Sequence, residues 1–141
     1  MLIKDVMCRD IKIIRPDTPL AVAARLMRDC DCGYLPVGED DRLKGAVTDR
    51  DIVVRGLAEG LSPDAPVSEV MTDRIVYCMD SDHVEVAARH MKAEQIRRLA
   101  VLDANRRIVG VVSIGDIARV TEDRDLTGSI ENAVAEDTVA A

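Results

Sequence analysis

The chain has 141 residues, of which 48% are hydrophobic, and this is sufficient for one compact domain with an apolar core. Aromatic residues are nearly absent (two Tyr, no Phe, no Trp), so the core must be aliphatic, and the stacked aromatic platforms of single-strand nucleic-acid binders are missing. The net charge is −7, and residues 122–141 contribute −5 of it. A near-neutral body with an acidic tail is a poor electrostatic match for a phosphate backbone, which argues against nucleic-acid binding.

The sequence contains no run of about 20 apolar residues and no signal-peptide pattern at its start. We therefore expect no membrane interaction and a cytoplasmic location. Thiols are kept reduced in that compartment, so the four cysteines are expected to be free.

The first predicted elements are a short β-rich run over residues 11–14 and a helix that follows it. Thr18 is the predicted N-cap of this helix and Pro19 its first residue, since these residue types favour those positions. Apolar residues then recur at helical spacing from Leu20 to Met27. Two short strands, 34–37 and 43–47, flank an acidic turn, and a second helix is predicted over 49–59.

The same β-α-β-β-α order recurs in the second half of the chain, where residues 82–85 resemble a capping box with Asp82 as the N-cap. A shift of 64 residues superimposes Val6-Met7 on Val70-Met71 and residues 22–25 on 86–89. After a one-residue insertion the shift is 65, and five residues, Arg42, Gly45, Val47, Asp51 and Ile52, coincide with Arg107, Gly110, Val112, Asp116 and Ile117. The sequence therefore predicts an internal duplication, with repeats over 1–60 and 67–121, a linker over 61–66 and an acidic tail over 122–141.

Longer motifs are duplicated in the same order. In the first copy they are Val6-Met7, 16–20 (PDTPL), 33–37 (GYLPV) and 43–53 (LKGAVTDRDIV). In the second copy they are Val70-Met71, 97–101 (RRLAV) and 108–118 (IVGVVSIGDIA). These duplicated motifs resemble the CBS-domain (cystathionine β-synthase) family, including stand-alone bacterial CBS pairs of the hypoxic-response type. The resemblance implies an α/β (α+β) fold in which two β-α-β-β-α repeats pack with pseudo-two-fold symmetry into one module.

Two hydroxyl-x-x-aspartate motifs, Thr48-x-x-Asp51 and Ser113-x-x-Asp116, are placed where a strand leads into a helix. A hydroxyl and free N–H groups at such a junction can bind a phosphate or ribose oxygen, and a carboxylate three residues on can accept both O–H groups of a ribose diol. The alternative is purely structural, because the same residues are helix caps and complement the helix dipole.

In CBS domains the aspartate binds ribose and the preceding hydrophobic-Pro strand lines an adenine slot in the cleft between the repeats. The resemblance thus implies a slot at Leu35 and Pro36 in the first repeat. Its counterparts, Leu99 and Ala100, lack the proline, so the site at Asp51 ranks above the site at Asp116.

Three arginines complete the predicted binding residues. Arg50 belongs to the first motif, and its counterpart in the second is Gly115. Arg97 and Arg98 precede the middle strand of the second repeat, where basic residues of similar proteins point toward ligand phosphates. The alternative for Arg97 and Arg98 is an ordinary solvated strand edge.

The cysteines and histidines do not show the spacing of a metal site. Cys32 and Cys78 align with Ile96 and Ile14, so both are predicted core positions, whereas Cys30 aligns with Glu94 and is predicted to be exposed. No catalytic constellation is present, so the chain is predicted not to be an enzyme.

The leading functional hypothesis is a regulatory sensor of AMP, ADP, ATP or S-adenosylmethionine, acting on an unknown regulated protein. An alternative is a dimeric interaction scaffold with vestigial clefts, and a third is a thiol or metal sensor involving Cys8 or Cys30. A homodimer is expected under the first two hypotheses.

Overall fold

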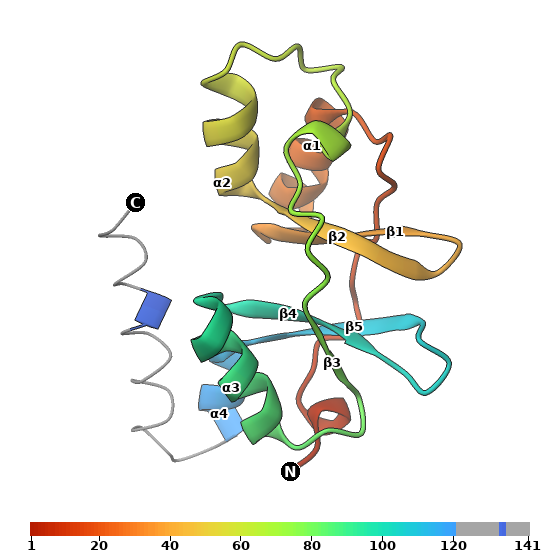
Figure 1. The fold of residues 1–141 in the computed structure, drawn as a ribbon, viewed down its shortest axis with the longest axis vertical. Coiled ribbons are helices and arrows are strands. Elements are labelled where there is room, and N and C mark those ends of the chain that lie inside the picture. The colour runs from red at the N-terminus through yellow and green to blue at the C-terminus, as the bar shows by residue number, and fades with distance from the viewer. Residues whose placement is uncertain (121–132, 135–141) are drawn as a thin grey trace. The chain divides into compact units, whose positions relative to one another are not determined.

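The computed structural model describes residues 1–120 and 133–134. These residues form two compact units, one made of Met1–Asp10 with the described residues from Val76 on, and the other of Ile11–Ile75 (Figure 1). Each unit combines helices with a small sheet, so the predicted α+β class is confirmed. The predicted acidic tail lies outside the described residues apart from 133–134. No helix in the described ranges is long and apolar enough to cross a membrane.

The unit Ile11–Ile75 is built on an antiparallel pair of strands. Its elements are α1 (Leu20–Cys30), β1 (Tyr34–Glu39), β2 (Arg42–Thr48), α2 (Asp49–Asp51), the π-helical turn η2 (Ile52–Leu57) and the 3-10 turn η3 (Val67–Glu69). Ile14 adds a parallel bridge to Val37 on one edge of this pair, and Thr72 adds an antiparallel bridge to Ala46 on the other.

The other unit repeats this arrangement around a three-stranded sheet. Its elements are η1 (Ile3–Asp5), β3 (Tyr77–Met79), α3 (Val84–Glu94), β4 (Arg98–Leu102), β5 (Ile108–Ser113) and α4 (Ile114–Val120). Strand β3 is parallel to β4, and β4 is antiparallel to β5. Cys8 adds an antiparallel bridge to Val111 on the outer edge of β5.

Each unit has its own aliphatic core, as the lack of aromatic residues requires. Along β1 and β2, Leu35, Val37 and Val47 are buried against α1. Along β4 and β5, Leu99 and Val112 are buried with residues of α3 and α4. Val and Ile suit this position because their branched side chains pack well on a pleated surface.

The compact units do not coincide with the sequence repeats, because the segment that opens each repeat packs on the sheet of the other. Cys8 pairs with β5, and its counterpart in the duplication, Thr72, pairs with β2. The two glycines at these contacts are also counterparts. A Cβ on Gly45 would overlap the carbonyl oxygen of Thr72, and a Cβ on Gly110 would lie 2.9 Å from the carbonyl oxygen of Cys8. Only glycine permits so close a backbone approach.

Both predicted helix starts are wrong by one residue. Pro19 is the N-cap of α1 and His83 that of α3, and neither provides a side-chain cap. Thr18 Oγ1 instead accepts a hydrogen bond from Arg15 N (3.1 Å), and Asp82 Oδ2 accepts one from Met79 N (2.8 Å). These polar residues stabilise the turns before the helices, which is the alternative use of the same side chains.

The predicted strand over residues 11–14 is reduced to the single bridge of Ile14. The other predicted strands of the first repeat are confirmed and extend further, and the second helix of that repeat continues as the π-helical turn to Leu57.

Replacing Gly45 by alanine should destabilise the protein by about 1–3 kcal/mol, because the new methyl group must displace the backbone at Thr72. The matched control is Gly115→Ala, where a Cβ would lie 3.6 Å from Ser113 Oγ in ordinary contact. Urea unfolding followed by far-UV circular dichroism measures both. Equal midpoints for Gly45→Ala and the wild type would contradict the close contact.

Candidate ligand-binding site

The predicted Thr48-x-x-Asp51 motif forms a reciprocal capping box at the junction of β2 and α2. Thr48 Oγ1 accepts a hydrogen bond from Asp51 N at 3.1 Å, and Asp51 Oδ2 accepts one from Thr48 N at 2.9 Å. Thr48 has an extended backbone, and both side chains are half-buried. The structural role that the sequence suggested is therefore present, and it fixes the orientation of both side chains.

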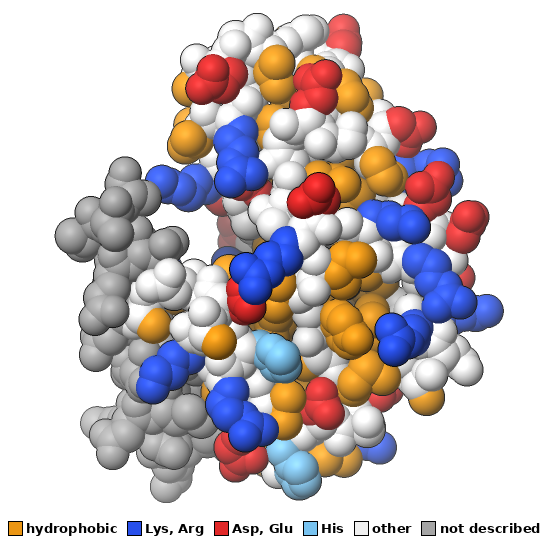
Figure 2. All heavy atoms as spheres, in the orientation of Figure 1, with side chains coloured by type: hydrophobic (Ala, Val, Ile, Leu, Met, Phe, Trp, Pro, Cys, Tyr) orange, Lys and Arg blue, Asp and Glu red, His pale blue; other side chains and the backbone are white. Residues whose placement is uncertain are grey.

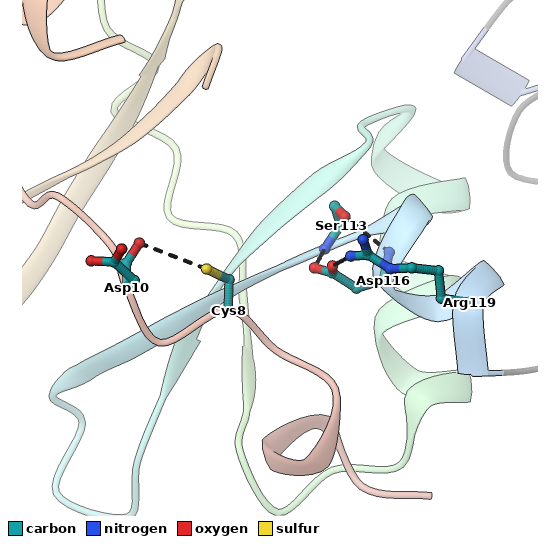
Figure 3. Close-up of polar contacts among 5 residues, drawn as sticks. All are labelled: Cys8, Asp10, Ser113, Asp116 and Arg119. Carbon is teal, nitrogen blue, oxygen red and sulfur yellow. Dashed lines mark hydrogen bonds and ion pairs between the residues drawn. The ribbon is translucent and has the colours of Figure 1, made fainter. Parts of the chain in front are cut away.

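The second motif repeats this geometry at the junction of β5 and α4. Ser113 Oγ accepts from Asp116 N at 3.1 Å, and Asp116 Oδ2 accepts from Ser113 N at 2.9 Å (Figure 3). The duplication has thus preserved a reciprocal pair of hydrogen bonds, not only a residue pattern.

The two aspartates differ in their second carboxylate oxygen. Asp116 Oδ1 is paired with Arg119 one helical turn further on, as Figure 3 shows, and its side chain is only 11% exposed. Within the described residues, Asp51 Oδ1 has no hydrogen-bond or ion-pair partner. The first site therefore offers a fixed carboxylate oxygen that no described residue neutralises.

The four predicted slot residues lie on β1 and β4 and are all buried, but they divide between two faces. Leu35 and Leu99 belong to the hydrophobic cores of their units. Since side chains alternate along a strand, Pro36 and Ala100 point to the opposite face of each sheet. Pro36 and Ala100 therefore lie on the face of each sheet that is turned away from its own core, and both are buried there.

Arg50, Arg97 and Arg98 are exposed. The carbonyl oxygen of Arg97 accepts a hydrogen bond from Ile114 N at 2.9 Å, which places the Arg97 backbone beside Ser113 and the start of α4. Within the described part of the chain, none of the three guanidinium groups has a hydrogen-bond or ion-pair partner. The charges of Arg97 and Arg98 thus lie on the unit that contains Asp116, and that of Arg50 lies on the unit that contains Asp51.

The structure adds Asp49, which the sequence analysis did not select. Asp49 N donates to the carbonyl oxygen of Gly33 at 3.1 Å, and Asp49 Oδ1 accepts from Arg50 N at 2.8 Å. A Cβ on Gly33 would lie 2.8 Å from Asp49 Oδ2, so the carboxylate lies directly over this glycine. The duplication pairs Gly33 with Arg97 and Asp49 with Ile114. This difference between the two copies is the signal in the sequence that could have pointed to Asp49.

The cysteines depart from the sequence prediction at one pair. Cys30 and Cys32 form a disulfide, so the expectation of four free thiols is wrong for these two. Asp31, between them, has a left-handed backbone (φ 51°) that ends α1 and turns the chain back. The predicted exposure of Cys30 is confirmed, and Cys32 is only half-buried.

The two free cysteines have opposite environments. Cys8 is exposed, and its Sγ donates to the carbonyl oxygen of Asp10 at 3.6 Å (Figure 3). Cys78 is buried, as predicted, and this burial, with a smaller contribution from the charge of Asp82, raises its pKa from 9.0 to about 12. The thiol of Cys78 is therefore a core side chain with almost no thiolate at neutral pH.

The histidines stand at the surface as two separate groups, and both are shown in pale blue in Figure 2. Among the described residues, no group of three or more His, Cys, Asp or Glu side chains could hold a metal ion.

The comparisons with known proteins agree with this architecture. Residues 3–57 and 67–123 each match the CBS domain family, and the chain therefore belongs to that family. The CBS domain-containing protein YhcV of Bacillus subtilis is 40% identical over 116 residues, and Hypoxic response protein 1 of Mycobacterium tuberculosis is 40% identical over 118 residues. Each alignment covers 82% of this chain and 82% of the relative.

Three solved structures are informative. The crystal structure of Hypoxic Response Protein I with two coordinated zinc ions has a TM-score of 0.79 and 37% identity, and covers 86% of this chain and 99% of that one. The CBS domain pair of MJ0100, in complex with 5′-methylthioadenosine and S-adenosyl-L-methionine, has a TM-score of 0.77 and 26% identity over 85% of this chain and 94% of that one. CBSX2 in complex with AMP has a TM-score of 0.73 and 26% identity over 84% and 93%.

The thiol environments predict a stepwise reaction with an aromatic disulfide reagent at pH 8. Native protein should react at Cys8 alone, because Cys78 is buried with a pKa of about 12 and the other two cysteines form a disulfide. Raising the pH to about 10 should still leave Cys78 silent, because burial holds its pKa at about 12. Unfolding should make Cys78 reactive, and reduction of the disulfide should make Cys30 and Cys32 reactive. Cys8→Ser should abolish the native reaction, and a native reaction in that variant would contradict the assignment.

Proposed function

We propose that this protein is a non-catalytic regulatory module that binds an adenosine-containing ligand, with its principal site at Thr48 and Asp51. The observation that supports this site most directly is the orientation of Asp51. One carboxylate oxygen is held by Thr48 N, and the other has no partner within the described residues. The helix cap therefore pre-positions an acceptor that no described residue neutralises.

The chemistry of a ribose diol fits this acceptor. Asp51 Oδ1 can accept a ribose O–H, and each such charge-assisted bond contributes about 1.5–3 kcal/mol when shielded from water. Thr48 Oγ1 uses a lone pair to cap Asp51 N, so its own O–H remains able to donate to a ligand oxygen. Pro36, which is buried on the face of β1 away from the core, is the proposed apolar contact for a base.

Two similar structures support the ligand class. The CBS pair of MJ0100 is in complex with 5′-methylthioadenosine and S-adenosylmethionine, and CBSX2 is in complex with AMP. These compounds share the adenosyl group and differ in what the 5′ carbon bears. We therefore propose AMP, ADP, ATP or S-adenosylmethionine as the class of ligand, with a second candidate site at Ser113 and Asp116.

Regulation would follow from differential binding. A ligand that binds one conformation of the module more tightly than another shifts the equilibrium toward that conformation. The free energy of the shift is no larger than the difference between the ligand's binding free energies for the two conformations. An unknown partner protein would sense the conformation that the ligand favours. A cytoplasmic location of the module stays a prediction.

A dimeric scaffold is the second candidate, and exposed apolar residues on one helix favour it. Val53, Val54 and Leu57 on η2 are 54%, 46% and 74% exposed. Figure 2 shows hydrophobic side chains at the surface over α1 and α2. Isolated apolar residues at a surface are common, but three within five residues of one helix suit burial against a second copy of the chain.

Replacing Asp51 by asparagine should lower the affinity for adenosine-containing ligands about tenfold or more, since the amide loses the charge that strengthens the ribose hydrogen bonds. The amide oxygen still accepts from Thr48 N, so the cap and the melting temperature without ligand should be nearly unchanged. The measurement is the rise in melting temperature with adenosine, AMP, ADP, ATP and S-adenosylmethionine. Asp116→Asn is the matched control and should retain most of the rise with adenosine and S-adenosylmethionine, the two ligands without a phosphate. An equal rise in melting temperature for the wild type and Asp51→Asn would contradict the proposal that Asp51 binds the ribose.

If η2 pairs two copies, Leu57→Glu should convert a dimer to a monomer, because the new charge would be buried at the contact. Size-exclusion chromatography with light scattering measures the mass. A Leu57→Glu variant that remains dimeric, or a monomeric wild type, would exclude this surface as the dimer contact.

A further inference from the structure

We propose that Asp49 determines which adenosyl ligand the Asp51 site accepts, by rejecting a phosphate group next to the ribose. The Asp51 site would then prefer adenosyl compounds that are neutral or positively charged at the 5′ position, such as a nucleoside, a thioether or a sulfonium. The site at Ser113 and Asp116 would instead favour phosphorylated nucleotides. This inference rests on the proposed function and deepens it.

The position of the Asp49 carboxylate is the main evidence. It lies over Gly33, within 2.8 Å of where a Cβ of that residue would be, and it accepts a hydrogen bond from Arg50 N at 2.8 Å. The same short stretch of backbone contains Thr48 and Asp51, whose side chains form the capping box. The chain thus has an anion at the residue that follows Thr48, whose hydroxyl would meet a 5′ substituent.

The corresponding pair of positions in the other unit is positive where this pair is negative. Ile114 replaces Asp49 and has no charged or accepting side-chain atom, and Arg97 replaces the neutral Gly33. Arg97 is joined to Ile114 by the same backbone hydrogen bond that joins Gly33 to Asp49, at 2.9 Å and 3.1 Å respectively. Arg98 adds a second exposed cation, and Arg119 neutralises Asp116.

Charge alone is sufficient to separate the ligands. The 5′-phosphate of AMP has a charge of roughly −1.5 to −2 at neutral pH, and the exposed carboxylate of Asp49 would repel a phosphate bound beside Thr48. Adenosine lacks this group and feels no such repulsion. We expect the neutralisation of Asp49 to reduce the preference for adenosine over AMP about tenfold, and high salt to weaken the effect of Asp49.

The experiment compares adenosine and AMP by isothermal titration calorimetry in an Asp116→Asn background, so that only the Asp51 site retains its carboxylate. Asp49→Asn keeps an oxygen that can accept from Arg50 N, so it changes the charge with little change in the local fold. The expected result is a ratio of adenosine affinity to AMP affinity about tenfold lower than in the parent.

The matched control is Asp41→Asn, which removes the same charge from the exposed turn at the other end of β1 and β2. This variant should leave the affinity ratio unchanged. The reciprocal variant, Ile114→Asp in an Asp51→Asn background, should raise the preference of the second site for adenosine over AMP.

Two negative results are distinguishable. If neither compound binds either site, the proposed function fails and the specificity of Asp49 fails with it. If adenosine binds the Asp51 site but Asp49→Asn and Asp41→Asn give the same affinity ratio as the parent, only the role of Asp49 is wrong.

Discussion

The reciprocal capping box at the strand-to-helix junction is the interaction on which the rest of this protein depends. A strand and a helix meet at Thr48 without an intervening loop, which leaves backbone N–H groups of the first helical turn without acceptors. Thr48 Oγ1 satisfies the N–H of Asp51, and the side chain of Asp51 in turn satisfies the N–H of Thr48. The same two bonds that begin the helix hold a carboxylate in one orientation, so a ligand that uses it need not order a mobile side chain.

The fold could be predicted from the sequence because the duplication constrains every element twice. The strands 34–37 and 43–47 were located closely, since apolar alternation and a turn signal agree in both copies. The helix starts were misplaced at Thr18 and Asp82, because a polar residue before an apolar run suits either a helix cap or a turn. Sequence alone does not separate these two uses, as both satisfy a backbone N–H with the same side chain.

Two features could not have been predicted from the alignment of one repeat with the other. Val6-Met7 and Val70-Met71 match each other, but a match between copies does not show which sheet each segment packs on. The bridges of Cys8 and Thr72 depend on contacts distant in the sequence. Likewise, alignment with Ile96 placed Cys32 in an apolar environment, while its disulfide with Cys30 depends on the left-handed backbone of Asp31.

The duplication also allows the demands of the fold to be separated from those of the site within one chain. Several features are the same in both units: the glycines at 45 and 110, the left-handed residues Asp31 and Gln95 that end α1 and α3, and the register shifts after Val37 and Val101. Each of these solves a backbone problem that any copy of this fold must solve.

The differences between the units are concentrated elsewhere. Gly33 and Arg97, Pro36 and Ala100, Asp49 and Ile114, and Arg50 and Gly115 are unlike pairs, and most of them lie at the junction that contains the capping box. Packing does not require these changes, because the backbone hydrogen bond between positions 33 and 49 is kept between positions 97 and 114. A surface that changes charge while its backbone stays constant is what the proposed difference in ligand preference between the two sites requires.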